Sequence, residues 1–300
     1  MEKNIFAAVL LLAALACSCS VKEDPSVADV EEPRISVTDF AIENGDPDTK
    51  TILTFIETGV RFTFVDGECL GIFPYAVKNA SQMPFYLNTI DATTCSMKCP
   101  GFALQAGVKY GAYYPYYPSY FITADAVPVN YTGQAQTSVD GTTFNIGTAD
   151  YLVANATPAD GTCFFRLSHI GSLVVMDVTA PETDTYTELS LNSSSAVFIT
   201  GGTIDVGQSI TLPGDGKPAQ GITIANTTTS SKVVLTLGGD SGIALTAGQT
   251  YRFCMMVAPV DLSASTVTLK LKTSSEAEFS TILTGKNLRQ GYAYRYNCTF

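Results

Sequence analysis

The chain has 300 residues, of which 46% are hydrophobic and 15% are charged, and its formal net charge is -11. Disordered proteins combine low hydrophobicity with high charge density, so this composition excludes a mostly disordered chain. The acidic balance and the lack of a Lys/Arg cluster argue against nucleic acid as a partner, because phosphate binding needs a basic stripe. A typical domain has about 150 residues, and the length therefore predicts two domains.

The chain begins with the pattern of a secretory signal. Lys3 precedes an apolar run from Ile5 to Ala16, which is shorter than the roughly 20 residues that a membrane-spanning helix needs. We therefore expect residues 1–18 to be a signal peptide.

Two cysteines lie at the end of this signal, each in a run that is similar to a bacterial lipobox. We predict lipidation at Cys19, because Ser20 and the acidic pair Glu23-Asp24 follow it as in surface-exported lipoproteins of the Bacteroidetes; Cys17 stays the alternative. Two acyl chains on one cysteine anchor a protein firmly. The expected location is the outer membrane, with the protein exposed at the cell surface and its N-terminal cysteine held by membrane lipid.

Residues 19–34 are expected to form the lipidated cysteine and an acidic tether. Residues 1–50 hold ten acidic and four basic side chains, whereas the other five sixths of the chain hold eighteen and thirteen. A charged segment that contains proline favours a solvated spacer between the membrane and a folded body. An acidic interaction tail is the alternative.

Six cysteines remain after the signal, and several of them lie in apolar strand-like runs. An even number in an exported protein permits disulfides, but a thiol in an apolar strand behaves as a small hydrophobic group, so we expect buried free thiols. With one histidine in the chain, an ordinary Cys/His zinc site is hard to complete. We predict no metal and no cofactor.

The body of the chain alternates between apolar and polar residues with a period of two, and turn signals such as Asp140-Gly141 separate the runs. The clearest runs are 233–237, 251–257, 267–272 and 292–300. This pattern predicts an all-β protein built of antiparallel β-sandwiches. The small, turn-rich segment Ala154 to Gly161 predicts a boundary, with an N-terminal sandwich at 35–158 and a C-terminal sandwich at 159–300.

The segment Gly239 to Gly242 is similar to the nucleophile signature of trypsin-like proteases. Such a serine needs a histidine base, and His169 has none of the expected sequence context. We therefore interpret the segment as a hairpin turn and His169 as a hydrogen-bonded structural residue. We predict that the chain is not an enzyme.

A tyrosine cluster gives the chain its most unusual local composition: Tyr113, Tyr114, Tyr116, Tyr117 and Tyr120. Exposed tyrosines offer an amphipathic surface that could bind glycan or protein. Tyrosines on both faces of a packed strand are the favoured alternative.

Several short motifs in this order resemble the fimbrillin family of Bacteroidetes lipoproteins, and the similarity covers nearly the whole mature chain. They lie at Phe64–Pro74, Tyr110–Tyr116, Gln134-x-Gln136, Asp150–Ala154, Phe165–Leu173, Ala247–Phe253, Val257–Pro259 and Leu288–Tyr294. The resemblance implies two transthyretin-like β-sandwich domains and a subunit of a type V pilus or a pilus-like adhesin. The implied partners are other pilin subunits, self or related, and host or bacterial surface receptors.

The resemblance also implies maturation by strand exchange, in which a trypsin-like protease removes an N-terminal strand and the groove accepts a strand of the next subunit. The basic candidates for cleavage are Arg34, Lys50 and Arg61. We expect the removable strand at Ile35 to Ile42, where the apolar alternation slips once between residues 37 and 40. The last strand, Tyr292 to Phe300, is either the replacement or a permanent part of the second sandwich. A glycan-binding surface lipoprotein that uses the tyrosine cluster is the alternative function.

Overall fold

The computed structural model describes residues 32–37, 40–42, 53–56, 59–62, 64, 68–75, 80–89, 94–119, 122–139, 149–211 and 218–300. These residues form strands and connections, with a single short 3-10 turn, η2 (Gly239–Ser241), so the all-β prediction is confirmed. The signal peptide, Cys17, Cys19, Lys50 and Tyr120 lie outside the described residues. Within the described part, no helix is long and apolar enough to span a membrane.

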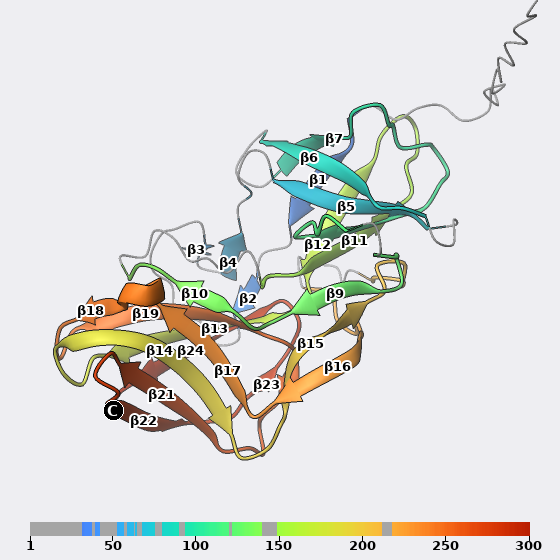
Figure 1. The fold of residues 1–300 in the computed structure, drawn as a ribbon. Coiled ribbons are helices and arrows are strands. Elements are labelled where there is room, and N and C mark those ends of the chain that lie inside the picture. Colours follow the sequence, from blue (N-terminus) through green and yellow to red (C-terminus); the bar gives the residue numbers. More distant parts are fainter. Residues whose placement is uncertain are drawn as a thin grey trace, which may run out of the picture.

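Seven strands close into a barrel at one end of the molecule (Figure 1). In spatial order they are β1 (Arg34–Val37), β12 (Phe164–His169), β11 (Leu152–Ala156), β8 (Tyr110–Tyr114), β5 (Cys69–Pro74), β6 (Met83–Thr89) and β7 (Thr94–Lys98). All neighbouring pairs are antiparallel except β1 and β12, which are parallel.

Two larger sheets lie at the other end of the molecule (Figure 1). The first contains β10 (Gln134–Gln136), β17 (Lys232–Leu237), β14 (Asp184–Ser193), β21 (Val267–Thr273) and β22 (Glu278–Leu283), with β18 (Ile243–Leu245) beside β14. The second contains β19 (Thr250–Val257), β13 (Ser172–Thr179), β24 (Tyr292–Cys298), β2 (Phe40–Ile42), β4 (Gly59–Phe62) and β3 (Leu53–Ile56).

The remaining strands form two small sheets. One contains β16 (Ile224–Ser230), β15 (Phe198–Ile204) and β9 (Val127–Asn130), and the other pairs β20 (Val260–Asp261) with β23 (Asn287–Leu288).

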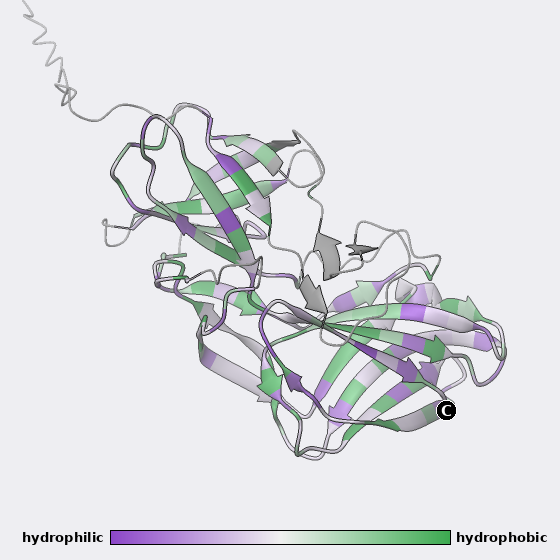
Figure 2. Ribbon diagram, turned by 180° about the vertical axis from the view of Figure 1, so that it is seen from behind, coloured by the Kyte–Doolittle hydropathy of each residue, from purple (hydrophilic) through white to green (hydrophobic). Residues whose placement is uncertain are grey.

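The sheet of β19, β13 and β24 is covered on both faces. On β13, Leu173 and Val175 belong to the core shared with the barrel, whereas Val174 and Met176 belong to the core shared with the first large sheet. This explains why seven successive residues of β13 are buried, whereas β21 alternates strictly between buried and half-buried positions. Figure 2 shows hydrophobic and hydrophilic segments interspersed along the strands of this half.

Strand pairing crosses the predicted boundary at residue 158 in both directions. β9 pairs with β15 and β10 pairs with β17, so two segments before the boundary join sheets made mostly of later residues. Conversely, β12 follows the boundary and completes the barrel between β11 and β1. The division into 35–158 and 159–300 stays a prediction.

Candidate functional site

The first strand of the described chain, β1, occupies the seam at which the barrel closes. It pairs in parallel with β12, where Ile35 lies opposite Phe165, and antiparallel with β7, where Ile35 lies opposite Cys95. The Arg34 N–H donates to the Cys163 carbonyl at 2.9 Å, and the Met97 N–H donates to the Pro33 carbonyl at 2.9 Å. The backbone of this strand is therefore hydrogen-bonded on both sides.

The side chains of β1 alternate as a half-buried strand requires. Ile35 is 0% exposed and belongs to the barrel core, whereas Arg34 points to solvent and Ser36 is half-buried. A β-branched apolar residue suits such a position, because its stiff side chain packs well on a pleated surface. The Ile35 side chain of this short strand therefore packs in the barrel core.

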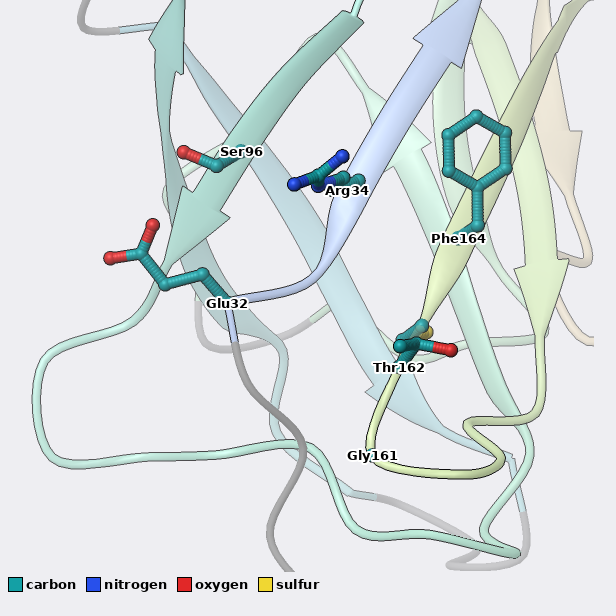
Figure 3. A pocket seen from close by; sticks show the side chains of 7 residues that line it. Glu32, Arg34, Ser96, Gly161, Thr162 and Phe164 are labelled. Carbon is teal, nitrogen blue, oxygen red and sulfur yellow. The ribbon is translucent and has the colours of Figure 1, made fainter. Parts of the chain in front are cut away.

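A cavity of about 880 Å³ lies where β1 enters the barrel (Figure 3). Its lining residues are Glu32, Arg34, Ser96, Gly161, Thr162, Cys163 and Phe164. Arg34 projects between Ser96 of β7 on one side and Phe164 of β12 on the other (Figure 3). The lining combines an exposed aromatic ring, hydroxyl groups and side chains of both charges.

The predicted strand Ile35 to Ile42 consists of two strands in different sheets, so its prediction as one strand is wrong. After β1, the chain leaves the barrel and forms β2, in which Ala41 pairs with Tyr292 of β24 and also with Gly59 of β4. The slip in alternation between residues 37 and 40 coincides with this passage between sheets.

The C-terminal strand β24 is an internal strand of the second large sheet. It lies between β13 and β2 and is parallel to both. Asp177 of β13 accepts hydrogen bonds from Arg252 of β19 at 2.8 Å and from Arg295 of β24 at 2.5 Å. Burial alone would raise the pKa of Asp177, but these two arginines outweigh it and hold the pKa below its usual value. An ion-pair cluster therefore ties three adjacent strands together.

A family model described as fimbrillin-like matches residues 102–300, which is more than half of the chain. The chain belongs to this family. Membership supports a role as a pilus subunit or adhesin at the cell surface. None of the curated proteins matches the chain.

Solved structures from two Bacteroides species share the fold of this fimbrillin-like chain. A candidate cell adhesion protein of Bacteroides ovatus has 17% sequence identity and a TM-score of 0.54, with 90% of this chain and 92% of that chain covered. A candidate cell adhesion protein of Bacteroides uniformis has 16% identity and a TM-score of 0.51, with 78% and 87% covered. At these identities the likeness shows the fold.

Of the three basic candidates for cleavage, two lie in described strands of this fimbrillin-like chain. Arg34 begins β1 and pairs with Phe164 and Ser96, and the backbone of Arg61 pairs with Thr54 inside the β3–β4 hairpin. Lys50 lies outside the described residues.

The predicted tyrosine surface is largely buried. Tyr113 and Tyr114 lie in β8, whose five residues are all buried, and Tyr116 is half-buried against the barrel core. Tyr114 donates a hydrogen bond to the Glu68 carboxylate at 2.6 Å. Tyr117 exposes 58% of its surface and is the most exposed ring of the described cluster. Packing on both faces of β8 is the reason why the exposed-surface alternative is wrong for Tyr113 and Tyr114.

The described cysteines are free thiols: Cys69, Cys95, Cys99, Cys163, Cys254 and Cys298. Burial raises the pKa of the Cys163 and Cys298 thiols to about 12, so neither ionises at neutral pH. The described residues contain no group of three His, Cys, Asp or Glu side chains that could hold a metal ion.

The protease-like signature forms the predicted turn. Ser241 lies in η2, an exposed 3-10 turn that follows β17, whereas His169 lies in β12 of the barrel. The His169 ring is completely buried, with its Nδ1 2.8 Å from the Asp150 carboxylate. The segment is an exposed turn, but it is not a hairpin, because β17 and β18 both pair with β14 rather than with each other, so the prediction of a hairpin is wrong. His169 has a hydrogen-bonded partner as expected.

Sequence reasoning missed the groove residues Ser96, Cys163 and Phe164, because nothing local shows that two distant segments flank β1. It also missed the cluster around Asp177, although a signal was present. Asp177, Arg252 and Arg295 are charged residues inside apolar strand-like runs, and buried charges need partners.

Proposed function

We propose that this chain is a surface lipoprotein that becomes a structural or adhesive subunit of a type V pilus, by strand exchange after proteolysis removes its N-terminal strand. The observation that carries the proposal is the place of β1, which pairs on both sides and contributes the fully buried Ile35 to the barrel core. Its loss leaves β7 and β12 each with one unpaired edge and exposes an apolar site between them. Such a groove is completed by an extended strand supplied in trans.

The cavity at the start of β1 supports the same proposal. It already offers space beside Arg34 while β1 is in place. A strand that arrives from another subunit can therefore contact Ser96 and Phe164 before the resident strand leaves. The partners proposed here are further pilin subunits of the same or a related chain.

Cleavage after Lys50 fits this mechanism better than cleavage after Arg34 or Arg61. A protease binds its substrate as an extended segment whose backbone must be free, and proteolytic sites concentrate in unpaired loops. Arg34 and Arg61 both lie in paired strands, and a cut after Arg34 would leave Ile35 on the retained chain, so we propose Lys50. A cut there separates β1 and β2 from the rest of the chain.

Limited trypsin treatment of the purified protein, followed by mass spectrometry and size-exclusion chromatography, tests the proposal. We expect cleavage at Lys50 and a ladder of oligomers, and we expect Lys50→Gln to prevent both, whereas Arg61→Gln changes neither. An unchanged, stable monomer after cleavage at Lys50 would overturn the mechanism.

A synthetic peptide of residues 33–42, which carries both β1 and β2, provides a second arm of the test. Added in excess to the cleaved protein, it should refill the groove and suppress the ladder. The same peptide with Ile35→Asp is the matched control, because burying an unpaired carboxylate is strongly unfavourable, and it should leave the ladder intact. Equal suppression by both peptides would contradict a groove that recognises Ile35.

A further inference from the structure

The Gln134-x-Gln136 motif lies at an unusual place, between the two large sheets. Both residues belong to β10, whose backbone pairs with β17 at the edge of the first large sheet. Both side chains are 1% exposed, so each carboxamide is buried and needs hydrogen-bond partners. Figure 1 shows β10 beside β19, an end strand of the second large sheet, and the side chains of β10 reach that strand.

Each of these two side chains bonds backbone groups of β19 and also donates to a carbonyl close to β10 in the chain, that of Tyr131 for Gln134 and that of Ser138 for Gln136, both at 2.8 Å. The Gln134 carboxamide accepts from the Met256 N–H at 2.7 Å and donates to the Met256 carbonyl at 2.8 Å. The Gln136 carboxamide accepts from the Cys254 N–H at 3.1 Å and donates to the Arg252 carbonyl at 2.9 Å. A carboxamide carries the same donor and acceptor as a peptide group, so it can replace one.

The spacing matches that of a strand. Successive outward-facing backbone groups of β19 come from residues two apart, and the two glutamines are also two apart on β10. The other side of β19 is paired with β13 over its full length, from Thr250 to Val257. Among the described residues, the glutamine side chains therefore occupy the position where a neighbouring strand of this sheet would bond.

We propose that Gln134 and Gln136 close the β19 edge and thereby bar a strand of a second copy of this chain from adding there. An unpaired edge of apolar residues is a template for strand addition, and Phe253 to Val257 of β19 are all buried. On the side of the sheet away from β19, the N-terminal strand β2 pairs beside β24 and is followed by β4 and β3. Closure of β19 directs strand addition in this sheet to the side on which β2 lies. The closure does not depend on proteolysis.

Gln134→Leu and Gln136→Leu in the uncleaved protein test this role, because leucine keeps the volume but removes the carboxamide. Gln290→Leu is the matched control: Gln290 is also buried and bonds the backbone N–H and carbonyl of Ile222, but Ile222 lies in a loop rather than at a sheet edge. Hydrogen exchange of individual amides and light scattering after size-exclusion chromatography are the measurements.

We expect amide exchange about tenfold faster at Met256 in Gln134→Leu and at Cys254 in Gln136→Leu, which is the change that the loss of one net hydrogen bond predicts. The double variant should form concentration-dependent oligomers, whereas Gln290→Leu should stay monomeric. If the double variant does not fold, each single variant must show its own amide effect together with weaker self-association. Unchanged exchange at both amides, or faster exchange without self-association beyond that of Gln290→Leu, overturns the proposal.

Discussion

The place of Ile35 makes Ile35→Ala the most informative substitution in the uncleaved protein. The change removes three carbon atoms from a side chain that is 0% exposed and packs among barrel residues. At about 0.8 kcal/mol for each buried methylene, transfer to water accounts for about 2.4 kcal/mol, and the residual cavity adds to this. We expect the barrel to lose about 3–4 kcal/mol of its free energy of unfolding.

Urea denaturation followed by tyrosine fluorescence, together with hydrogen exchange of β7 and β12, measures this loss. Ser36→Ala is the matched control in the same strand, because Ser36 is half-buried and should shift the free energy of unfolding by no more than about 0.5 kcal/mol. If Ile35→Ala and Ser36→Ala unfold at the same urea concentration, then β1 is not a core strand of the barrel. The reasoning about the groove would then be wrong.

Three further predictions follow from other parts of the chain. Cys19→Ala should abolish acylation and membrane retention, and mass spectrometry of the mature N-terminus decides between Cys19 and Cys17. Asp177→Asn should lower the free energy of unfolding by about 1–3 kcal/mol at neutral pH, because it weakens charged hydrogen bonds to Arg252 and Arg295. Because folding lowers the pKa of Asp177, its carboxylate stabilises the folded protein fully above its usual pKa of 3.8, and this stabilisation is lost as the pH falls through the lowered pKa. Urea titrations across that pH range should show this loss for the unchanged protein and not for Asp177→Asn. Ser241→Ala should change stability by no more than about 0.5 kcal/mol, and a fluorophosphonate probe should label neither form; labelling of Ser241 would contradict its assignment to a turn.

The strands of the C-terminal half could be predicted closely from the sequence. The runs 233–237, 251–257 and 267–272 correspond to β17, β19 and β21, with bounds that differ by one residue. The run 292–300 contains β24, which ends two residues earlier, at Cys298. Period-two alternation is a local property that survives folding, because it reflects which face of each strand is buried.

The pairing of the strands could not be predicted, because it depends on segments far apart in the chain. The parallel contact between β1 and β12 joins residues about 130 positions apart and closes the barrel. Nothing near Ile35 distinguishes a strand of a barrel from a strand of a sandwich. The passage from β1 to β2 left one local trace, the slip in alternation, which we interpreted as an irregularity within one strand.

The burial of the tyrosine cluster also could not be predicted from the sequence. Alternation assumes that one face of a strand meets solvent, but every residue of β8 is buried. The hydroxyl groups of Tyr113 and Tyr114 have partners on segments distant in the chain, Gln82 and Glu68. Composition alone therefore could not separate a binding surface from a packed strand.

The two N-terminal strands also connect the proposed cut with the proposed closure. Residues 34–42 supply one strand to the barrel and one to the sheet that contains β24, so a single cut after Lys50 acts on both. In the proposed mechanism, loss of these strands would open a groove between β7 and β12 in the barrel and would free the side of β24 on which β2 lies in the sheet. Gln134 and Gln136 bond the β19 edge of that sheet, and Asp177 ties β24 to β13. An incoming strand would therefore find an unpaired edge of this sheet only beside β24, on the side that β2 occupied. An incoming strand is thereby limited to positions that the removed segment occupied, which is the condition for subunits to join in a fixed register.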